Sequence, residues 1–256
     1  MQRTHQARPV TAALLDPLDT RHGFGPLWRL PGVYPPQEDT LLLARTVRAE
    51  VTPGMDVLDI GTGSGALALC AAGSGAQVTA VDVSWRAALT TRVNARHLRL
   101  PVEVRRGTAP QAVRGRRFDL VISNPPYVPA PRACLPRHGA ARSWDAGRNG
   151  RAVIDQICAA APVLLKAHGA LLMVHSALSG VDATLAGLAE TGLWGEVVER
   201  ARIPYGPVVR SRLSWLIRQG LVRAGQQSEE LVVIRAEQRS PSAGSLTAAR
   251  EGESSP

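Results

Sequence analysis

The sequence predicts an α/β protein built on a doubly wound, mostly parallel sheet. Short apolar segments with a strand pattern alternate with longer segments that have helical periodicity, which is typical of strands joined by helical crossovers. A glycine-rich turn, Gly61–Gly65, joins the first of these strands to a helix. A later apolar strand, Phe118–Ser123, stops at two prolines that cannot continue a central strand.

Seven strands and the helices between them can be placed along the chain. The first helix begins with Asp39 or Thr40 as its N-cap and ends before Pro53-Gly54. The strands are predicted at 57–60, 78–82, 102–104, 118–123, 170–175, 195–201 and 231–236. Further helices are predicted at 66–72, 85–98, 151–167, 181–191 and 208–219. Right-handed crossovers then place helices on both faces of the sheet.

The length of 256 residues fits one large domain with extensions. Residues 1–32 are predicted to be a partly ordered N-terminal extension, and residues 33–236 to be the folded domain. Residues 237–256 are rich in Ser, Ala, Gly, Arg and Glu, which predicts a disordered tail.

Composition excludes several classes of function. No apolar run is long enough for a membrane span, and the polar N-terminus lacks the apolar core of a secretion signal. The three cysteines are far apart, so we expect neither a metal site nor disulfides, and a reducing cytoplasm fits. The net charge of +9 is almost entirely arginine. It favours an acidic partner such as RNA or a ribosome, although genome composition explains the arginine usage equally well.

The segment Asn124-Pro125-Pro126-Tyr127 carries the clearest chemical signal. It follows a buried strand, and ligands of open α/β sheets bind outside the carboxyl ends of strands. The Asn124 side-chain oxygen and the Pro125 carbonyl can accept the two hydrogens of a planar –NH2 group. Tyr127 offers a flat face beside that group. These residue types predict methylation of an amide or amino nitrogen.

A nucleoside-binding pattern precedes this segment. Gly61, Gly63 and Gly65 allow positive φ and close approach of a ligand to the backbone. Asp82 ends the next strand, where its two oxygens can accept both hydroxyls of a ribose, and Val83 can pack on a purine. Asp59 and the backbone around Gly61 can meet a cationic amino group.

The same glycine loop also satisfies G-x-G-x-x-A, so a nicotinamide-binding oxidoreductase is a rival interpretation. Two features favour S-adenosylmethionine. The charge of Asp59 suits a methionine ammonium and would repel a pyrophosphate. The segment 124–127 has a use in amino methylation and none in hydride transfer.

Residues 33–236 resemble class I S-adenosylmethionine-dependent methyltransferases, whose fold is a seven-stranded Rossmann-like sheet. Within that class they resemble the HemK-like enzymes, which methylate the glutamine of a Gly-Gly-Gln motif in class I peptide release factors. The segments that carry the resemblance are VYPPQEDTLLL (33–43), VLDIGTGSG (57–65), VDVS (81–84), FDLVISNPPYVP (118–129) and WDAGRNGRAVIDQI (144–157).

The resemblance implies a set of roles. It implies cofactor contacts from Thr40, Asp59, Gly61, Asp82 and Asn124, while residues 124–127 hold the substrate amide. Such enzymes usually carry an acid after the third strand for the adenine amino group, where this chain has Thr108-Ala109. Thr108 can accept a hydrogen bond there, more weakly than a charged acid. Other acceptors that the same segment could serve are the amino group of adenine or guanine in nucleic acid and a small-molecule amine.

Two smaller signals concern partners. Topology places several arginines on the site's side of the sheet, where we expect contact with RNA or a ribosome-related partner: Arg132, Arg137, Arg142, Arg148 and Arg151. Residues 144–151 can be a lid over the substrate or a turn into the next helix, with Asn149-Gly150 as turn residues. A partner subunit and the oligomeric state cannot be read from the sequence.

Overall fold

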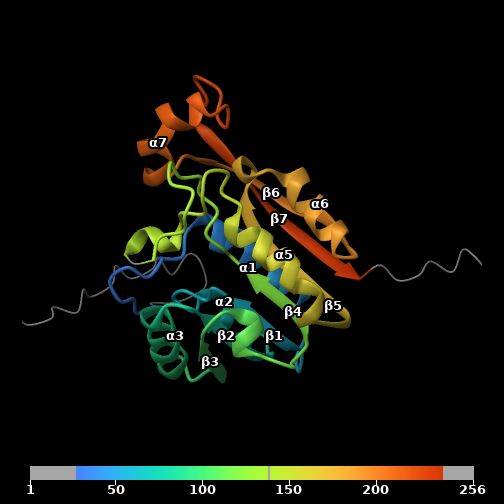
Figure 1. Ribbon diagram of the computed structural model, residues 1–256. Coiled ribbons are helices and arrows are strands. Elements are labelled where there is room, and N and C mark those ends of the chain that lie inside the picture. Colours follow the sequence, from blue (N-terminus) through green and yellow to red (C-terminus); the bar gives the residue numbers. More distant parts are fainter. Residues whose placement is uncertain (1–26, 138, 239–256) are drawn as a thin grey trace, which may run out of the picture.

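A computed structural model describes residues 27–137 and 139–238. Within them, the chain forms one seven-stranded sheet (Figure 1). The predicted tail lies outside the described residues, except that the last strand extends two residues beyond 236. Most of the predicted N-terminal extension, up to residue 26, lies outside them as well. The strands are β1 (Asp56–Ile60), β2 (Gln77–Asp82), β3 (Val102–Arg106), β4 (Phe118–Ser123), β5 (Leu165–Ser176), β6 (Leu193–Pro204) and β7 (Ser228–Gln238).

The strand order β3-β2-β1-β4-β5-β7-β6 is that of a doubly wound sheet. All neighbours pair in parallel except β7, which runs antiparallel to both β5 and β6. The order reverses between β1 and β4, where Ile60 is paired with Ser123. Such a switch point leaves a crevice at the carboxyl ends of the strands. The predicted fold class is therefore confirmed.

Helices cover both faces of the sheet (Figure 1). Helices α1 to α3 pack on one face and α4 to α6 on the other, while α7 follows β6 and lies beyond the carboxyl end of the sheet. The helices are α1 (Glu38–Glu50), α2 (Ala66–Gly73), α3 (Trp85–His97), α4 (Ala109–Ala112), α5 (Ala152–Leu164), α6 (Val181–Glu190) and α7 (Pro207–Arg218), with short 3-10 turns η2 (Ala140–Ser143) and η3 (Ala177–Ser179).

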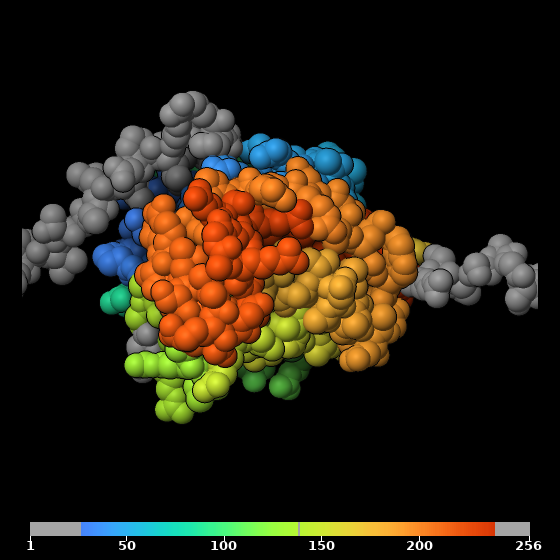
Figure 2. Space-filling model, turned by 90° about the horizontal axis from the view of Figure 1, so that it is seen from above, coloured from blue at the N-terminus to red at the C-terminus, as the bar shows by residue number. Residues whose placement is uncertain are grey.

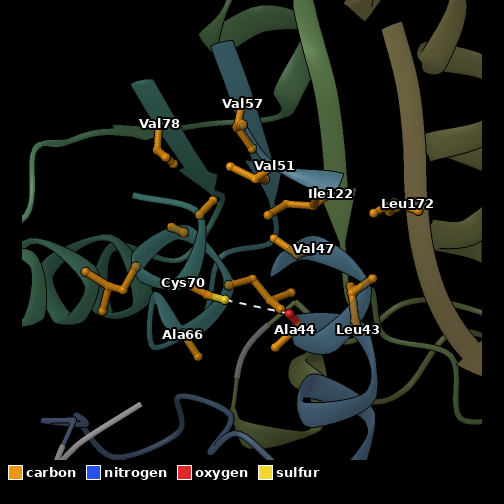
Figure 3. Close-up of a cluster of buried hydrophobic side chains, with 14 of the residues drawn as sticks. Leu43, Ala44, Val47, Val51, Val57, Ala66, Cys70, Val78, Ile122 and Leu172 are labelled. Atoms are coloured by element: carbon orange, nitrogen blue, oxygen red, sulfur yellow. Dashed lines mark hydrogen bonds between the residues drawn. The ribbon is translucent and has the colours of Figure 1, made fainter. Parts of the chain in front are cut away.

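The core on the first face is packed closely (Figure 3). Helix α2 is made almost entirely of Ala, Leu and Cys, and its small side chains let it lie against both α1 and the sheet. The Sγ atom of Cys70 is 3.7 Å from the carbonyl oxygen of Ala44 on α1 (Figure 3). Cys70 is buried between α2 and α1.

Element boundaries differ from the prediction where tertiary contacts decide them. Helix α5 ends at Leu164 rather than 167, because Leu165 already pairs with Phe118 as β5 begins. The next residue, Lys166, bonds to Asp56 and Asp119 at 2.6 and 2.9 Å, tying three strands together at their amino ends. The short helix α4 was not predicted. No helix within 27–137 and 139–238 is long and apolar enough to cross a membrane.

Candidate active site

A cavity of ≈ 860 Å³ opens at the switch point between β1 and β4. The carboxyl ends of β1, β2 and β4 form its floor, and residues from the loops 32–36 and 135–145 form its walls. Its size suits a cofactor together with a substrate side chain. The predicted site residues that line it are Thr40, Gly61, Gly63, Asp82, Val83, Thr108, Ala109, Asn124, Pro125, Pro126 and Tyr127.

The glycines of the turn after β1 divide into two groups. Gly61, Gly63 and Gly65 have positive φ angles of 73°, 58° and 89°, as the sequence predicted. A Cβ added at Gly61 or Gly63 would meet no side chain within 4 Å, so ligand atoms can approach the backbone there. At Gly65 a Cβ would lie 2.9 Å from Cγ2 of Thr91, so this glycine serves the packing of the turn on α3 and not the cavity wall.

Asp59 lies buried directly behind the glycine turn. Its Oδ2 accepts a hydrogen bond of 2.6 Å from the Thr62 hydroxyl, while Oδ1 is buried and has no hydrogen-bond partner in the part of the chain that the structure describes. Burial, and secondarily the negative charge of Asp82, raises the pKa of this carboxyl to about 7, against the effect of the Thr62 hydrogen bond. A buried carboxylate oxygen without a partner is a site for a cation.

Asp82 ends β2 with both oxygens fixed by the backbone. Oδ2 accepts from the N–H of Gly63 at 3.1 Å, and Oδ1 accepts from the N–H of Ser84 at 2.8 Å. Each oxygen keeps a further lone pair for a hydroxyl. Burial raises the pKa of Asp82, while these two hydrogen bonds and the positive charge of Arg142 lower it. Asp82 lines the cavity, whereas Asp59 lies buried behind the glycine turn and is not among the lining residues.

At the end of the cavity beside β3, the structure adds residues that the sequence did not predict. Thr108 precedes α4, is exposed, and its side chain makes no capping hydrogen bond, so its hydroxyl is available to a ligand. Gln156 and Val153 on α5 also line this end of the cavity, and sequence reasoning missed them. They lie one helical turn apart on one face, a spacing that by itself indicates only a shared surface.

The segment after β4 presents its acceptors to the cavity. The side-chain N–H of Asn124 donates to the Thr40 hydroxyl at 3.1 Å, and within the described residues the Asn124 carbonyl oxygen accepts no hydrogen bond. Among the residues described, no hydrogen bond reaches the Pro125 carbonyl. The Ser123 hydroxyl donates to the Ile60 carbonyl at 2.8 Å and so ties the end of β4 to β1.

Asp39 and Tyr34 are site residues that sequence reasoning missed. Asp39 was expected as an N-cap, but α1 begins at Glu38 after Gln37 and has no side-chain cap. Instead, Oδ2 of Asp39 accepts from the hydroxyls of Tyr127 and Tyr34 at 2.9 and 3.0 Å. The prediction was wrong because a carboxylate in a first helical turn is usually explained by local capping, and only the tertiary fold brings the two tyrosines to it.

Residues 144–150 support the segment after β4 from behind. The N–H of Val128 donates to the Trp144 carbonyl at 2.8 Å, and Ala146 donates back to Val128 at 3.1 Å. Asn149 accepts from the N–H of Arg151 through its side chain, which is turn chemistry. Residues 149–151 therefore form a turn into α5, whereas Trp144, earlier in the same segment, lines the cavity.

Arg151 does not take the predicted position. Its side chain is buried, with the residue only 8% exposed, and donates to the carbonyls of Ser179 and Gly180 and to the Thr184 hydroxyl. It also pairs with Asp155 at 2.6 Å. The expectation that Arg151 meets RNA was wrong, because these bonds hold its guanidinium inside the protein.

A switch-point cavity with a glycine turn, two acids and an outward-facing Asn-Pro-Pro-Tyr segment defines a class I methyltransferase. The family model described as "Methyltransferase small domain" matches residues 26–133. Methyltransferase HEMK2 of Homo sapiens is 33% identical over 148 residues, which are 54% of this chain and 68% of that protein. The chain belongs to the HEMK2 family of methyltransferases. The rival interpretation as a nicotinamide-dependent oxidoreductase is thereby wrong.

Two further comparisons concern the sequence and the fold. A protein of Enterococcus faecalis named "Release factor glutamine methyltransferase" is 32% identical over 147 residues, covering 54% of this chain and 53% of that protein. A chain of the E. cuniculi Mtq2–Trm112 complex has the same fold, with a TM-score of 0.56 and 22% identity over 81% of this chain and 99% of that one.

The cofactor of this class is S-adenosyl-L-methionine, and the cavity fits it. The unpartnered buried oxygen of Asp59 suits a cationic amino group, and the open backbone at Gly61 and Gly63 leaves room beside it. No group of three or more His, Cys, Asp or Glu side chains able to hold a metal occurs in the described part of the chain.

Proposed function

We propose that this protein transfers a methyl group to the side-chain nitrogen of the glutamine in the Gly-Gly-Gln motif of a class I peptide release factor. The observation that carries the proposal is the orientation of Asn124, whose N–H is used by Thr40 and whose oxygen is left as an acceptor in the cavity. The E. faecalis relative is named for this reaction, and the E. cuniculi complex is described as methylating the termination factor eRF1.

The proposed substrate pose uses two acceptors. The side-chain oxygen of Asn124 and the backbone carbonyl of Pro125 each accept one N–H of the glutamine amide. Pro126 stiffens the turn, and the ring of Tyr127 lies beside the planar amide. Held in this way, the nitrogen presents its face toward the methyl donor. The fixed geometry lowers the entropic cost of bringing the two reacting atoms together. The nitrogen loses its proton as or after the methyl group arrives.

The residues proposed to hold the cofactor lie along the other half of the cavity. The negative charge of Asp59 attracts the methionine ammonium, which lies against the backbone around Gly61 and Gly63. Asp82 accepts hydrogen bonds from the ribose hydroxyls. Val83, Thr108 and Ala109 contact the adenine, and Thr40 and Asn124 lie between cofactor and substrate. When bound, S-adenosylmethionine supplies an electrophilic methyl group on a positively charged sulfur. Gly65 is left out of this set, because its Cβ position faces Thr91.

The partner-facing surface is proposed to be the rim of the cavity. Arg132, Arg137 and Arg148 are exposed there, and Arg142 reaches inward toward Asp82. Helix α7 and the residues after it, seen in Figure 2, extend this rim, because they lie next to the segment that follows β4. Exposed arginines on that insertion are Arg210, Arg218 and Arg223. We propose that this rim meets RNA or a ribosome-related partner, with Arg151 excluded.

We further propose that the protein works in the cytoplasm, where release factors act, and that residues 33–238 form its methyltransferase domain. The upper limit is moved from 236 because β7 pairs with β6 as far as Gln238. An adenine, guanine or small-molecule amine would fit the same two acceptors of Asn124 and Pro125, so these alternatives enter as outcomes of the test.

The test is transfer of labelled methyl groups from S-adenosylmethionine to a purified class I release factor. A release factor with Gln→Ala in its Gly-Gly-Gln loop is the control, and Asn124→Ala is the enzyme control. Label that is lost with both controls supports the proposal. Label that persists with the Gln→Ala factor would overturn the glutamine assignment, and nucleic acids and small amines would then be assayed with the same enzyme pair.

A further inference from the structure

Asp39 is a buried carboxylate that is satisfied by hydrogen bonds alone. It is 3% exposed, and no ion pair within the described residues includes it. Oδ1 accepts from the backbone N–H and the hydroxyl of Thr40 at 2.6 and 3.2 Å, and Oδ2 accepts from Tyr34 and Tyr127. Burying a carboxylate in this way is costly, so four oriented donors indicate a built arrangement.

The first branch of this arrangement runs to Asn124. A hydroxyl has one hydrogen to donate and lone pairs with which to accept. Because the Thr40 hydroxyl donates to Asp39, it faces Asn124 with a lone pair, and only the N–H side of the Asn124 amide can bind it. The amide oxygen is thereby turned into the cavity. The direction of each bond is set by Asp39, which can only accept.

The second branch runs to Tyr127. Its hydroxyl donates to Asp39, and the Tyr34 hydroxyl donates to the same oxygen. Burial raises the pKa of both tyrosines above the usual range, and the charge of Asp39 raises it further, as does the buried Glu229. Both phenols therefore stay protonated donors, which fixes the direction of this branch too.

We propose that Asp39 is a positioning residue, which through Thr40 and Tyr127 holds the Asn124 oxygen and the Tyr127 ring in the orientation that receives the substrate amide. This inference rests on the proposed function for its kinetic consequence only. A carboxamide at position 39 would offer an NH2 group to one branch, where both branches need an acceptor, so Asp39→Asn breaks the arrangement with almost no change in volume.

The kinetic test compares Asp39→Asn and Thr40→Val with Glu38→Gln. Glu38 is the neighbouring acid, exposed and outside the network, so its variant controls for loss of a carboxylate at the start of α1. We expect kcat to fall about 10- to 100-fold in the first two variants, the scale of a small misplacement of reacting groups. Cofactor Kd should stay within about threefold of the wild type, and the double variant should lose little more than either single one.

Two kinetic results would overturn the proposal. One is a kcat for Asp39→Asn equal to that of Glu38→Gln. The other is a Thr40→Val enzyme that reaches normal kcat at saturating cofactor with a weakened cofactor Kd, because Thr40 would then act only as a cofactor ligand. Cofactor binding and thermal unfolding of each variant are measured first, since a variant that binds cofactor normally is folded.

A spectroscopic test needs no substrate and so separates this inference from the proposed function. The chain has three asparagines, Asn94, Asn124 and Asn149, so protein labelled with 15N-asparagine gives three side-chain NH2 signals, and Asn124→Ala identifies one of them. We expect hydrogen exchange of the Asn124 NH2 group to be slow in the wild type and Glu38→Gln, and at least about tenfold faster in Thr40→Val and Asp39→Asn. Equal exchange in all four proteins would overturn the proposal even if glutamine methylation is confirmed.

Discussion

Arg212 on α7 forms an ion pair with Asp145, with 2.7 Å between Nη2 and Oδ1, and both side chains are largely buried. The Nη1 of Arg212 also donates to the Pro129 carbonyl at 3.0 Å. Pro129 lies two residues after the end of the Asn-Pro-Pro-Tyr segment, and Asp145 lies in the segment that backs it. Helix α7, inserted between β6 and β7, is therefore attached both to the loop that follows β4 and to the segment behind that loop.

Replacing Arg212 by alanine should destabilise the protein by about 3 kcal/mol, because it leaves the Asp145 carboxylate largely buried without its partner. The kcat should fall as well, since the loop at Pro129 loses a support. Urea unfolding and methyl-transfer kinetics measure the two effects. Ser214→Ala, at an exposed position on the same helix, is the control and should change neither. Equal losses for both variants would mean that α7 contributes only general stability.

Asp59→Asn should stabilise the protein at alkaline pH and weaken cofactor binding. The folded-state pKa of Asp59 is about 7, raised above its unfolded value mainly by burial. Stability from such a group is present at low pH and lost as the pH rises through about 7. The variant should therefore melt higher than wild type at pH 8 and by a smaller margin, or not at all, at pH 5.5. Asp182→Asn, an exposed acid in the first turn of α6, is the control.

For the cofactor, titration calorimetry at pH 8 should show weaker binding to Asp59→Asn, because the amide carries no charge to meet the ammonium. Wild-type affinity should also fall as the pH drops below about 7, where Asp59 takes up a proton. A variant that binds normally at pH 8 would refute the role of Asp59 in holding the ammonium.

Gly150→Ala should displace the backbone of the segment that follows β4. Its φ is +73°, and an added Cβ would lie 2.3 Å from the Tyr127 carbonyl oxygen and 2.7 Å from the Ser179 hydroxyl, which itself bonds to that carbonyl. Gly220 has nearly the same φ, +71°, with open space at its Cβ, so Gly220→Ala measures the conformational cost alone. We expect about 1 kcal/mol for Gly220→Ala and about 3 kcal/mol or more for Gly150→Ala, with kcat lowered only in the latter. Matching unfolding curves would contradict the clash.

Thr108→Asp should strengthen cofactor binding by about fivefold to tenfold, because a charged acceptor binds an amino group more strongly than a hydroxyl does. The position is exposed at the cavity wall and its side chain caps no helix, so an acid fits without rearrangement. Thr108→Val should bind more weakly than wild type. If Asp and Val variants bind alike, the adenine is read elsewhere, and Gln156 on the facing helix is the next position to change.

Charge reversal at the rim should weaken RNA binding in a salt-dependent way. The triple change of Arg132, Arg137 and Arg148 to Glu should lower affinity for a ribosomal RNA fragment and reduce the slope of log K against log salt by about one per lost phosphate contact. Arg114 is exposed at the opposite end of the sheet, so Arg114→Glu is the control. A loss of affinity with Arg114→Glu that matches the rim variant would remove the case for this surface.

The sequence by itself determined the seven strands, the longer helices and the chemical class of the site. Alternating strands and helices, the glycine turn at 61–65 and the proline stop after Ser123 are local signals, since strand periodicity, positive φ and a missing N–H depend on a few neighbouring residues. Because the carboxyl ends of parallel strands meet at one edge, these signals also placed Asp82 and Asn124 around one crevice before any contact was known.

Only the tertiary structure decided what lies behind that crevice. Asp39 looked like a helix cap, Arg151 like a surface charge and Gly65 like part of the ligand cradle, and each serves a contact made across the fold. Tyr127 is 88 residues from Asp39 along the chain, and Thr184 is 33 residues from Arg151. A side chain's partner at such a distance is set by how helices dock on the sheet, which no local pattern of residues encodes.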